Sequence, residues 1–258
     1  AGLLGGYTGG LFGIGGGTVI VPMLVTVFPF FGTTHAALLH MAVGTSLALL
    51  IPNTYVSVRK QYKMGNFDAA LFKSWVPFII IGALIGVSVV KFVPTLYLKI
   101  IFAAYLYLAF LLVALKKERD TDIVGRPHGI GKDIAGIVFG VTAIFLGIGA
   151  GTFTMPYCRF CNYPMKKAIA ISSATGLVIG IIGTVGVIIS GWGVSGRAPY
   201  SLGFVNIIAF VLMTPVLVFI SPYGVAMANR VSRTGLQWLY AGFLLLVAVY
   251  MTYLVFQA

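Results

Sequence analysis

Long apolar runs are the feature of this sequence that most restricts its fold. Six stretches of about 20 residues carry few charges, which is the length needed to cross a hydrocarbon core of about 30 Å. They cover residues 35–58, 69–90, 95–115, 164–190, 203–221 and 236–256. Of the 258 residues, 59% are hydrophobic and only 9% are charged, against roughly a quarter in soluble domains. The sequence therefore excludes a soluble globule and predicts an all-α polytopic membrane protein.

The charge is strongly basic, with 17 Lys and Arg residues, five acidic residues and a net charge of +12. Such an excess raises nucleic acid as a partner, but these cations lie in the gaps between the apolar runs. That placement is typical of residues that orient a protein in a membrane. We expect the lipid bilayer as partner and no nucleic acid, with the chain in the plasma (inner) membrane. The sequence leaves the oligomeric state open.

Two further apolar segments, residues 2–31 and 134–160, are interrupted by the glycine clusters 13–17 and 147–151. A continuous helix is disfavoured there, because each Gly costs about 1 kcal/mol relative to Ala. The charged stretch 116–133 divides the chain nearly in half. We therefore predict a first membrane repeat (1–115), a cytoplasmic linker (116–133) and a second membrane repeat (134–258).

The two halves resemble each other in sequence. Residues 13–22 read GIGGGTVIVP and residues 147–156 read GIGAGTFTMP, identical at six of ten positions. Weaker echoes relate residues 42–46 to 170–174 and residues 65–68 to 203–206. Coincidence in a glycine-rich chain is the alternative, but three echoes in the same order favour duplication, which is common among transporters.

Each glycine-broken segment either crosses the bilayer or enters it and returns to the same side. If both cross, the cations divide almost evenly between the two sides. If both are re-entrant, every cation except Lys91, Lys99 and Arg197 falls on one side, as the positive-inside rule requires of the cytoplasmic side. We therefore predict two inverted repeats, each with one re-entrant segment and three transmembrane helices, and both termini outside.

The glycine clusters are the predicted binding site. Non-helical backbone at bilayer depth is tolerated only inside protein or beside a polar cavity, and each cluster precedes a short helical pattern. Free N–H groups at a helix start bind anions. The predicted site therefore comprises Gly15, Gly16, Gly17 and Thr18, with Gly149, Ala150, Gly151 and Thr152. The alternative is that these glycines serve only helix packing, as we expect of Gly82 and Gly86.

Small hydroxyl residues lie deep in two of the apolar runs, namely Thr45, Ser46, Ser172, Ser173 and Thr175. Such residues commonly bond their own helix or a neighbour, but beside a glycine break they are also candidate anion donors, and the first four join the predicted site.

For Asn53 we favour an interhelical hydrogen bond. His40 is a further candidate, as a positive charge near the outer entrance or a proton carrier. Its alternative is an interfacial residue bonded to water or backbone.

The remaining polar residues indicate no cofactor, metal site or catalytic group. Cys158 and Cys161 are too few for a disulfide framework or a four-ligand zinc site. We favour reduced, structurally neutral thiols over a redox or sulfur-relay role. No acidic residue falls inside an apolar run except at its edge, where Asp68 and Asp133 are predicted to begin and cap helices.

The paired G-I-G-[GA]-G-T-x-x-x-P motifs, the A-V-G-T-S-L sequence at 42–47 and the G-x-F-D turn at 65–68 resemble the sulfite exporter TauE/SafE family over nearly the whole chain. The resemblance implies transport of a small sulfur-containing anion such as sulfite or an organosulfonate. The second repeat departs from the pattern, because Ala150 replaces a glycine and Ser172-Ser173-Ala174 replaces Thr-Ser-Leu.

We therefore predict a secondary transporter that moves this anion by alternating access. The absence of membrane carboxylates favours export, because an anion leaving a negative-inside cell gains about 2.3 kcal/mol per charge per 100 mV without a coupling ion. An anion channel is the alternative. An intramembrane enzyme is less favoured, since no run contains paired carboxylates, an H-E-x-x-H motif or a Ser/His/Asp set.

Overall fold

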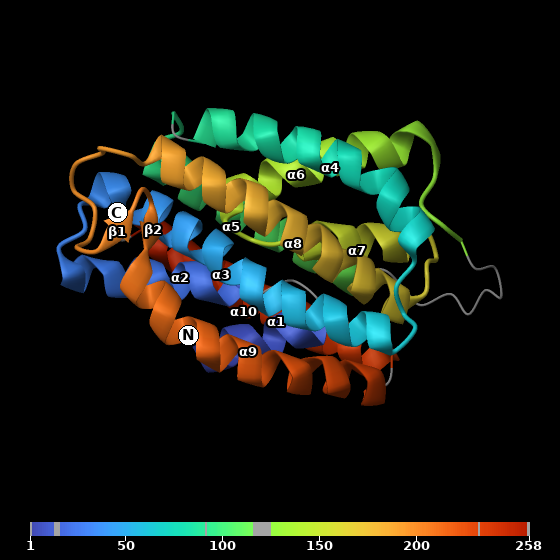
Figure 1. Ribbon diagram of the computed structural model, residues 1–258. Coiled ribbons are helices and arrows are strands. Elements are labelled where there is room, and N and C mark those ends of the chain that lie inside the picture. Colours follow the sequence, from blue (N-terminus) through green and yellow to red (C-terminus); the bar gives the residue numbers. More distant parts are fainter. Residues whose placement is uncertain (1, 13–15, 91, 116–124, 232, 257–258) are drawn as a thin grey trace.

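The computed structural model describes residues 2–12, 16–90, 92–115, 125–231 and 233–256, and these are almost entirely helical (Figure 1). The first half contains α1 (Gly2–Phe12), α2 (Gly17–Val27), the 3-10 helix η1 (Phe28–Phe31), α3 (His35–Lys63), α4 (Ala69–Val90) and α5 (Thr95–Ala114). The second half contains α6 (Gly129–Leu146), α7 (Gly151–Phe160), α8 (Met165–Ser190), β1 (Ser201–Leu202), β2 (Val205–Asn206), α9 (Ile207–Arg230) and α10 (Arg233–Phe256).

The six predicted apolar runs coincide with α3, α4, α5, α8, α9 and α10. By length and composition, α3, α4, α6, α8 and α9 contain stretches able to cross a membrane, whereas α5 and α10 offer shorter apolar stretches within the described residues. The protein is thus an integral, multi-pass membrane protein built of α-helices. Several boundaries differ from the prediction: α3 continues to Lys63 rather than ending at 58, and α9 runs from Ile207 to Arg230 rather than from 203 to 221. Helix α9 begins later because residues 201–206 form an antiparallel hairpin.

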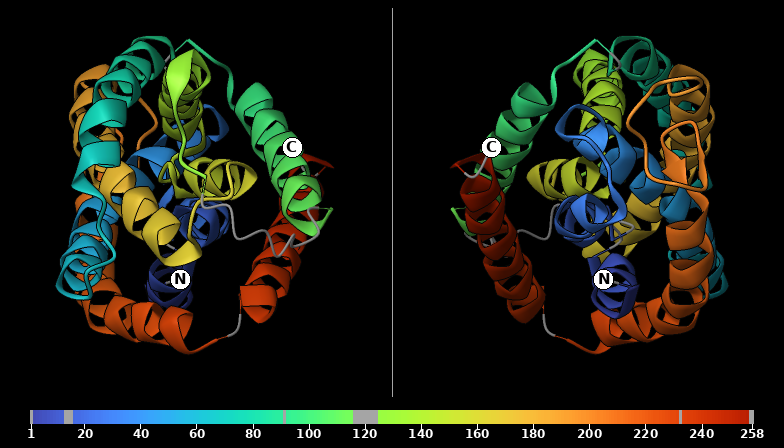
Figure 2. Two further views of the ribbon diagram at one scale, coloured as in Figure 1. Left: turned by 90° about the vertical axis from the view of Figure 1, so that its right-hand side faces the viewer. Right: turned by 90° about the vertical axis from the view of Figure 1, so that its left-hand side faces the viewer.

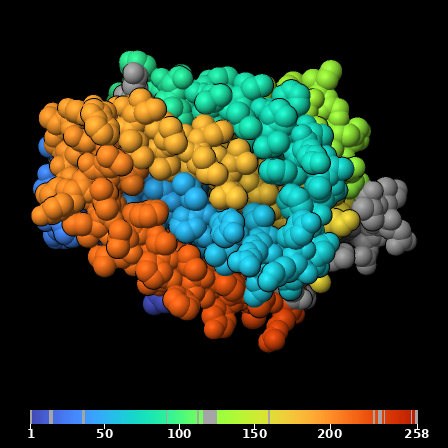
Figure 3. Space-filling model, in the orientation of Figure 1, coloured from blue at the N-terminus to red at the C-terminus, as the bar shows by residue number. Residues whose placement is uncertain are grey.

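The same succession of helices occurs in both halves, and equivalent pairs pack together. Helix α4 packs on α6, and α9, which has the place of α4 in the second half, packs on α1. Likewise, α3 contacts α9, and α8, which has the place of α3, contacts α4. The helices that correspond between halves, α3 with α8 and α5 with α10, also pack against each other. Figure 3 shows one face of the bundle, on which α4, α8, α3 and α9 follow one another.

Helices α3 and α8 run in opposite directions. The Ser57 hydroxyl meets that of Ser173 at an Oγ–Oγ distance of 2.9 Å. Further along the interface, Gly180 faces Leu50 and Gly183 faces Leu47. Residue numbers therefore rise along α8 as they fall along α3, so these two corresponding helices are antiparallel.

The segment from α6 to α7 begins and ends at the same end of the bundle. The Phe153 and Tyr157 rings of α7 lie 5.5 and 5.7 Å from the Phe139 ring of α6, so α7 runs back beside α6. After α7, the Asn162 carbonyl accepts a hydrogen bond from Gly125, just before α6, at 3.3 Å. We call this the linker end of the bundle, and the opposite end, which carries β1 and β2, the hairpin end (Figure 1).

The two predicted acidic caps differ. Asp68 caps α4, because its Oδ1 accepts a hydrogen bond from the Leu71 N–H at 2.9 Å. Asp133 does not begin a helix, since α6 starts at Gly129 and overlaps the predicted linker. Its carboxylate instead pairs with Lys132 at 3.1 Å.

Glycines allow α4 and α6 to approach closely. A Cβ added to Gly82 would lie 2.1 Å from the Ile137 carbonyl oxygen, and one on Gly140 would lie 2.4 Å from that of Ile79. Real Cβ contacts are much longer, so the backbones themselves are in contact here. Gly10 and Gly224 provide the equivalent contact between α1 and α9.

Candidate functional site

The two glycine breaks meet inside the bundle, where α2 and α7 are surrounded by the longer helices (Figure 2). A Cβ added to Gly17, the first residue of α2, would lie 2.6 Å from the Gly147 carbonyl oxygen and 2.9 Å from the Cα of Ile148. Only glycine fits this approach. The start of one short helix therefore touches the break that precedes the other, and we call this contact the junction.

The two short helices start in the same way. The Gly16 carbonyl accepts hydrogen bonds from Val19 and Ile20 at 3.0 Å, and the Ala150 carbonyl accepts them from Phe153 and Thr154 at 2.9 and 2.7 Å. Within the described residues, the amides that follow these carbonyls have no backbone acceptor. They belong to Gly17, Thr18, Gly151 and Thr152. Free amides at the positive end of a helix favour an anion.

The two breaks also differ in backbone conformation. Gly16 has a φ of +80°, which favours glycine, and a Cβ there would lie 2.2 Å from the Gly5 carbonyl oxygen. Ala150 is fully buried without a positive φ, so alanine is accommodated at the equivalent position. Gly149 lies against Gly176 of α8, because a Cβ added to Gly176 would be 3.7 Å from the Gly149 Cα. Gly15 lies outside the described residues.

Several candidate hydroxyl groups are buried in this region. Ser46 donates to the Gly147 carbonyl at 2.7 Å and so ties α3 to the second break, while Thr152 donates to Gly149 at 3.3 Å. The hydroxyls of Thr18 and Ser172 are fully buried and find no hydrogen-bond partner in the described chain. An unpaired buried hydroxyl is costly, so these two are candidate donors to a ligand, as is the Thr154 hydroxyl in the first turn of α7.

The structure does not bring all the predicted residues to the junction. The Thr45 hydroxyl accepts a hydrogen bond from the Asn206 N–H at 2.9 Å, and thus contacts the hairpin. The His40 ring lies 5.3 Å from that of Phe204, with Nε2 3.3 Å from the Val90 carbonyl. Ser173 contacts Ser57 and its own helix, as expected of an interhelical hydroxyl.

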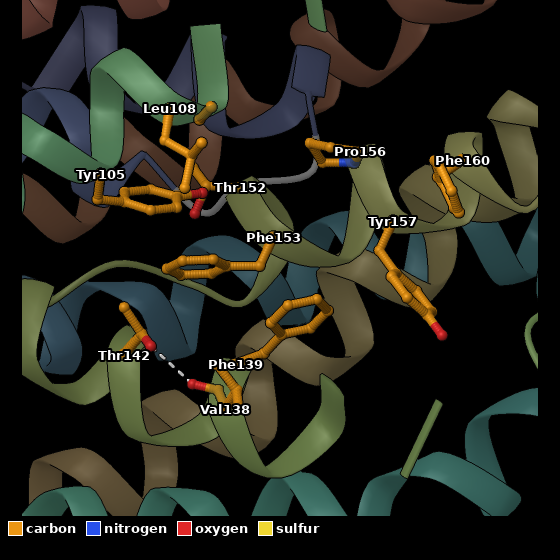
Figure 4. A pocket seen from close by; sticks show the side chains of 11 residues that line it. Tyr105, Leu108, Val138, Phe139, Thr142, Thr152, Phe153, Pro156, Tyr157 and Phe160 are labelled. Carbon is orange, nitrogen blue, oxygen red and sulfur yellow. Dashed lines mark hydrogen bonds between the residues drawn. The ribbon is translucent and has the colours of Figure 1, made fainter. Parts of the chain in front are cut away.

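A cavity of about 430 Å³ lies on the other side of α7, between α5 and α6 (Figure 4). Its walls combine aromatic and aliphatic side chains, and the Phe153 ring lies 4.1 Å from that of Tyr105 and 5.5 Å from that of Phe139. Among the described residues that line it, Thr152 is the one candidate site residue and none is charged. The cavity suits hydrocarbon rather than a small anion.

Sequence reasoning missed a polar cluster at the linker end. Asp68 accepts hydrogen bonds from Tyr163 at 2.8 Å and from Arg126 at 2.9 Å. Burial raises the pKa of Asp68, but the Leu71 and Tyr163 hydrogen bonds and the charges of Arg126 and Lys167 outweigh it, so the pKa lies below its usual 3.8. The echo between residues 65–68 and 203–206 was the available signal, because Asn206 caps α9 as Asp68 caps α4.

Cys158 is buried and Cys161 is half-buried, and the two are not joined by a disulfide. Among the residues that the structure describes, no group of three metal-ligating side chains comes together.

Comparison with known proteins gives one family and several relatives. The family model of the sulfite exporter TauE/SafE matches residues 1–251. A probable membrane transporter protein of Haemophilus influenzae is 32% identical over 97% of this chain and 95% of its own length. One from Methanocaldococcus jannaschii is 27% identical over 97% of this chain and 92% of its own. One from Bacillus subtilis is 29% identical over 74% of this chain and 77% of its own. No solved structure matches the chain significantly.

Proposed function

The chain belongs to the sulfite exporter TauE/SafE family of membrane proteins, and from this we propose that it exports a small sulfur-containing anion, such as sulfite or an organosulfonate. The observation that carries the proposal is the junction, where Gly17 of α2 lies against the break before α7. The anion binds there to the free amides of the two helix starts, with Thr18 and Ser172 as hydroxyl donors. Backbone amides suit an oxyanion because they attract its charge without holding it in a full ion pair.

The two halves form inverted repeats in this proposal, and the segments α1–α2 and α6–α7 are re-entrant. The antiparallel course of α3 and α8 supports the inversion. The return of α7 toward Gly125 supports re-entrance of the second segment. Inverted repeats around one central site can expose that site to either side of the membrane in turn, which is alternating access.

The linker end faces the cytoplasm in this arrangement. Arg59, Lys63, Arg126, Lys166 and Lys167 belong to the turns and helix termini of that end, in keeping with the positive-inside rule. Export of an anion from the cytoplasm then follows the membrane potential and needs no coupling ion. The plasma membrane is the proposed location.

A reconstituted transport assay tests the proposal. Proteoliposomes are loaded with labelled sulfite, and efflux is measured against external sulfite, sulfate, thiosulfate, taurine and chloride. We expect saturable exchange that sulfite or a sulfonate competes for and chloride does not. Flux that never saturates would instead favour the anion channel, and chemical conversion of the anion in detergent would favour an enzyme.

Glycine variants test the site. We expect Gly16→Leu and Gly151→Leu to abolish flux, because a side chain at Gly16 would meet the Gly5 carbonyl and displace the start of α2, and Gly151 is the first residue of α7. Gly242→Leu is the matched control, since a Cβ at Gly242 in α10 meets nothing within 4 Å. Wild-type flux in both break variants would refute the site, and size-exclusion profiles identify any variant that fails to fold.

A further inference from the structure

A row of polar side chains follows α3 from the junction toward the linker end. Asn53, Ser57 and Gln61 are spaced one helical turn apart, and their exposed fractions are 0, 2 and 1%. The same face of the helix holds Ser46, which donates to Gly147 at the junction. Polar groups buried at bilayer depth are costly and often mark the path of a substrate or ion. From Ser46 to Gln61 the helix rises about 22 Å.

The lower part of this row is linked to α8 and to the turn before α4. Ser57 meets Ser173 at 2.9 Å, and Ser173 in turn donates to the Ile169 carbonyl at 3.0 Å. Gln61 accepts a hydrogen bond from the Asn66 side chain at 2.7 Å. Ser172, the neighbour of Ser173, has a buried hydroxyl without a hydrogen-bond partner in the described residues.

The row ends at a basic pocket. A cavity of about 230 Å³ at the linker end is lined by Asn66 and Ile169, the residues to which the row is linked, and by Lys166 and Lys167. Both lysines are exposed. Neutral hydrogen-bond donors inside the bundle therefore lead to positively charged side chains at its surface. This arrangement attracts an anion through a low-dielectric region without binding it too tightly to leave.

The row has no counterpart in the other half. With the register set by residues 42–46 and 170–174, the positions on α8 that correspond to Asn53, Ser57 and Gln61 are Ile181, Val185 and Ile189. These three are exposed and apolar. The buried polar row is therefore a feature of the linker-end half of α3, and the second half does not repeat it at these positions.

We propose that Asn53, Ser57 and Gln61 line the route by which the anion travels between the junction and the linker end. Their hydroxyl and amide groups replace the water around the anion, and Lys166 and Lys167 form its mouth. This inference rests on the proposed function, because it assumes an anion bound at the junction. If the row instead serves only to hold α3 to α8, it will be closed to water.

Cysteine accessibility tests the route independently of transport. Ser57→Cys and Gln61→Cys are introduced into a Cys158→Ser, Cys161→Ser background and reconstituted in vesicles of known orientation. They are treated with 2-sulfonatoethyl methanethiosulfonate, which is anionic, or with its cationic trimethylammonium counterpart. Thr54→Cys is the matched control, since Thr54 is equally buried on α3 but bonds its own helix at Leu50.

We expect modification of Ser57→Cys and Gln61→Cys from the linker-end face, faster with the anionic reagent, and none of Thr54→Cys. No reaction from that face would overturn the route.

In a second arm, we expect Ser57→Leu and Gln61→Leu to lower labelled sulfite flux about tenfold, with Thr54→Val unaffected. Unchanged flux in the two leucine variants would show that the reagent reaches these positions but that the anion does not pass them, and it would also overturn the proposal. If the wild type carries no sulfite, the proposed function fails, while the labelling arm still decides the route.

Discussion

The Tyr163 hydroxyl donates a hydrogen bond to the Asp68 carboxylate across 2.8 Å, and this bond joins the two halves of the protein at the linker end. Asp68 lies in the turn between α3 and α4, and Tyr163 lies in the turn between α7 and α8. Arg126, just before α6, pairs with the same carboxylate. At the hairpin end the equivalent residue is Asn206, which is neutral and bonds Thr45 of the first half through its N–H. Under the alternating access proposed above, we expect each of these contacts to break when the end that holds it opens.

Removal of the Tyr163 hydroxyl tests this contact. We expect Tyr163→Phe to lower the free energy of unfolding by about 0.5–1.5 kcal/mol, the usual contribution of one hydrogen bond, and to favour states open at the linker end. Thermal unfolding in detergent measures the first effect, and the rate at which Gln61→Cys is modified measures the second. Tyr223→Phe is the control, because Tyr223 is 68% exposed. Equal modification rates in both variants would show that Tyr163 does not hold this end closed.

The Asp68 carboxylate gives this contact a defined pH dependence. Burial raises its pKa, but hydrogen bonds from Leu71 and Tyr163 and the nearby cations outweigh that effect, so the folded pKa lies below 3.8. Its stabilisation is therefore complete above about pH 4 and is lost as the pH falls through the folded pKa. Burial and the bond to Asp68 raise the pKa of Tyr163, so Tyr163 stays protonated and can donate. We expect Asp68→Asn to be less stable than wild type near pH 6, with a smaller difference near pH 3.

Much of the fold follows from the sequence, because burial in lipid leaves a strong signal. The apolar runs located six helices, and the two glycine clusters located both helix breaks. The two-residue strands of the hairpin left no such signal, since they depend on a positive φ at Gly203 and on the contact between Asn206 and Thr45.

The composition of the site was less predictable than its place. The glycine motifs indicated the junction, but side-chain direction depends on tertiary partners that sequence spacing does not specify. Thr45 and His40 therefore face the hairpin end, although each is close in sequence to Ser46, which faces the break. The buried polar row of α3 escaped notice because Ser57 and Gln61 lie at the polar edge of an apolar run, where exposure is the usual expectation.

The aromatic wall behind α7 yields a stability prediction. Phe153 is 8% exposed and packs between Tyr105, whose ring is tilted against it, and Phe139, on which it stacks. We expect Phe153→Ala to lower the unfolding free energy by about 3–5 kcal/mol, as for other buried phenylalanines. Phe160→Ala is the control at the rim of the same cavity, because Phe160 is 75% exposed. A thermal unfolding midpoint equal to that of the control would show that the stack does not support α7.

The unpartnered hydroxyls of Thr18 and Ser172 allow binding and folding to be separated. Both are fully buried and lack a partner in the described residues, so each carries a desolvation cost of about 1–3 kcal/mol in the absence of ligand. We expect Thr18→Val and Ser172→Ala to leave the ligand-free protein as stable as wild type or more so. Sulfite binding should weaken about tenfold, because each substitution removes a hydrogen bond to a charged ligand.

A purely structural hydroxyl would behave in the opposite way. Thr54 bonds the Leu50 carbonyl, so Thr54→Val should lose a little stability and keep its affinity for sulfite. Unfolding midpoints with and without sulfite give both quantities from one experiment, since a ligand that binds only the folded state raises the midpoint according to its affinity. If Thr18→Val and Ser172→Ala are destabilised while their sulfite-induced shifts stay at the wild-type value, these hydroxyls serve the fold and the anion is held elsewhere.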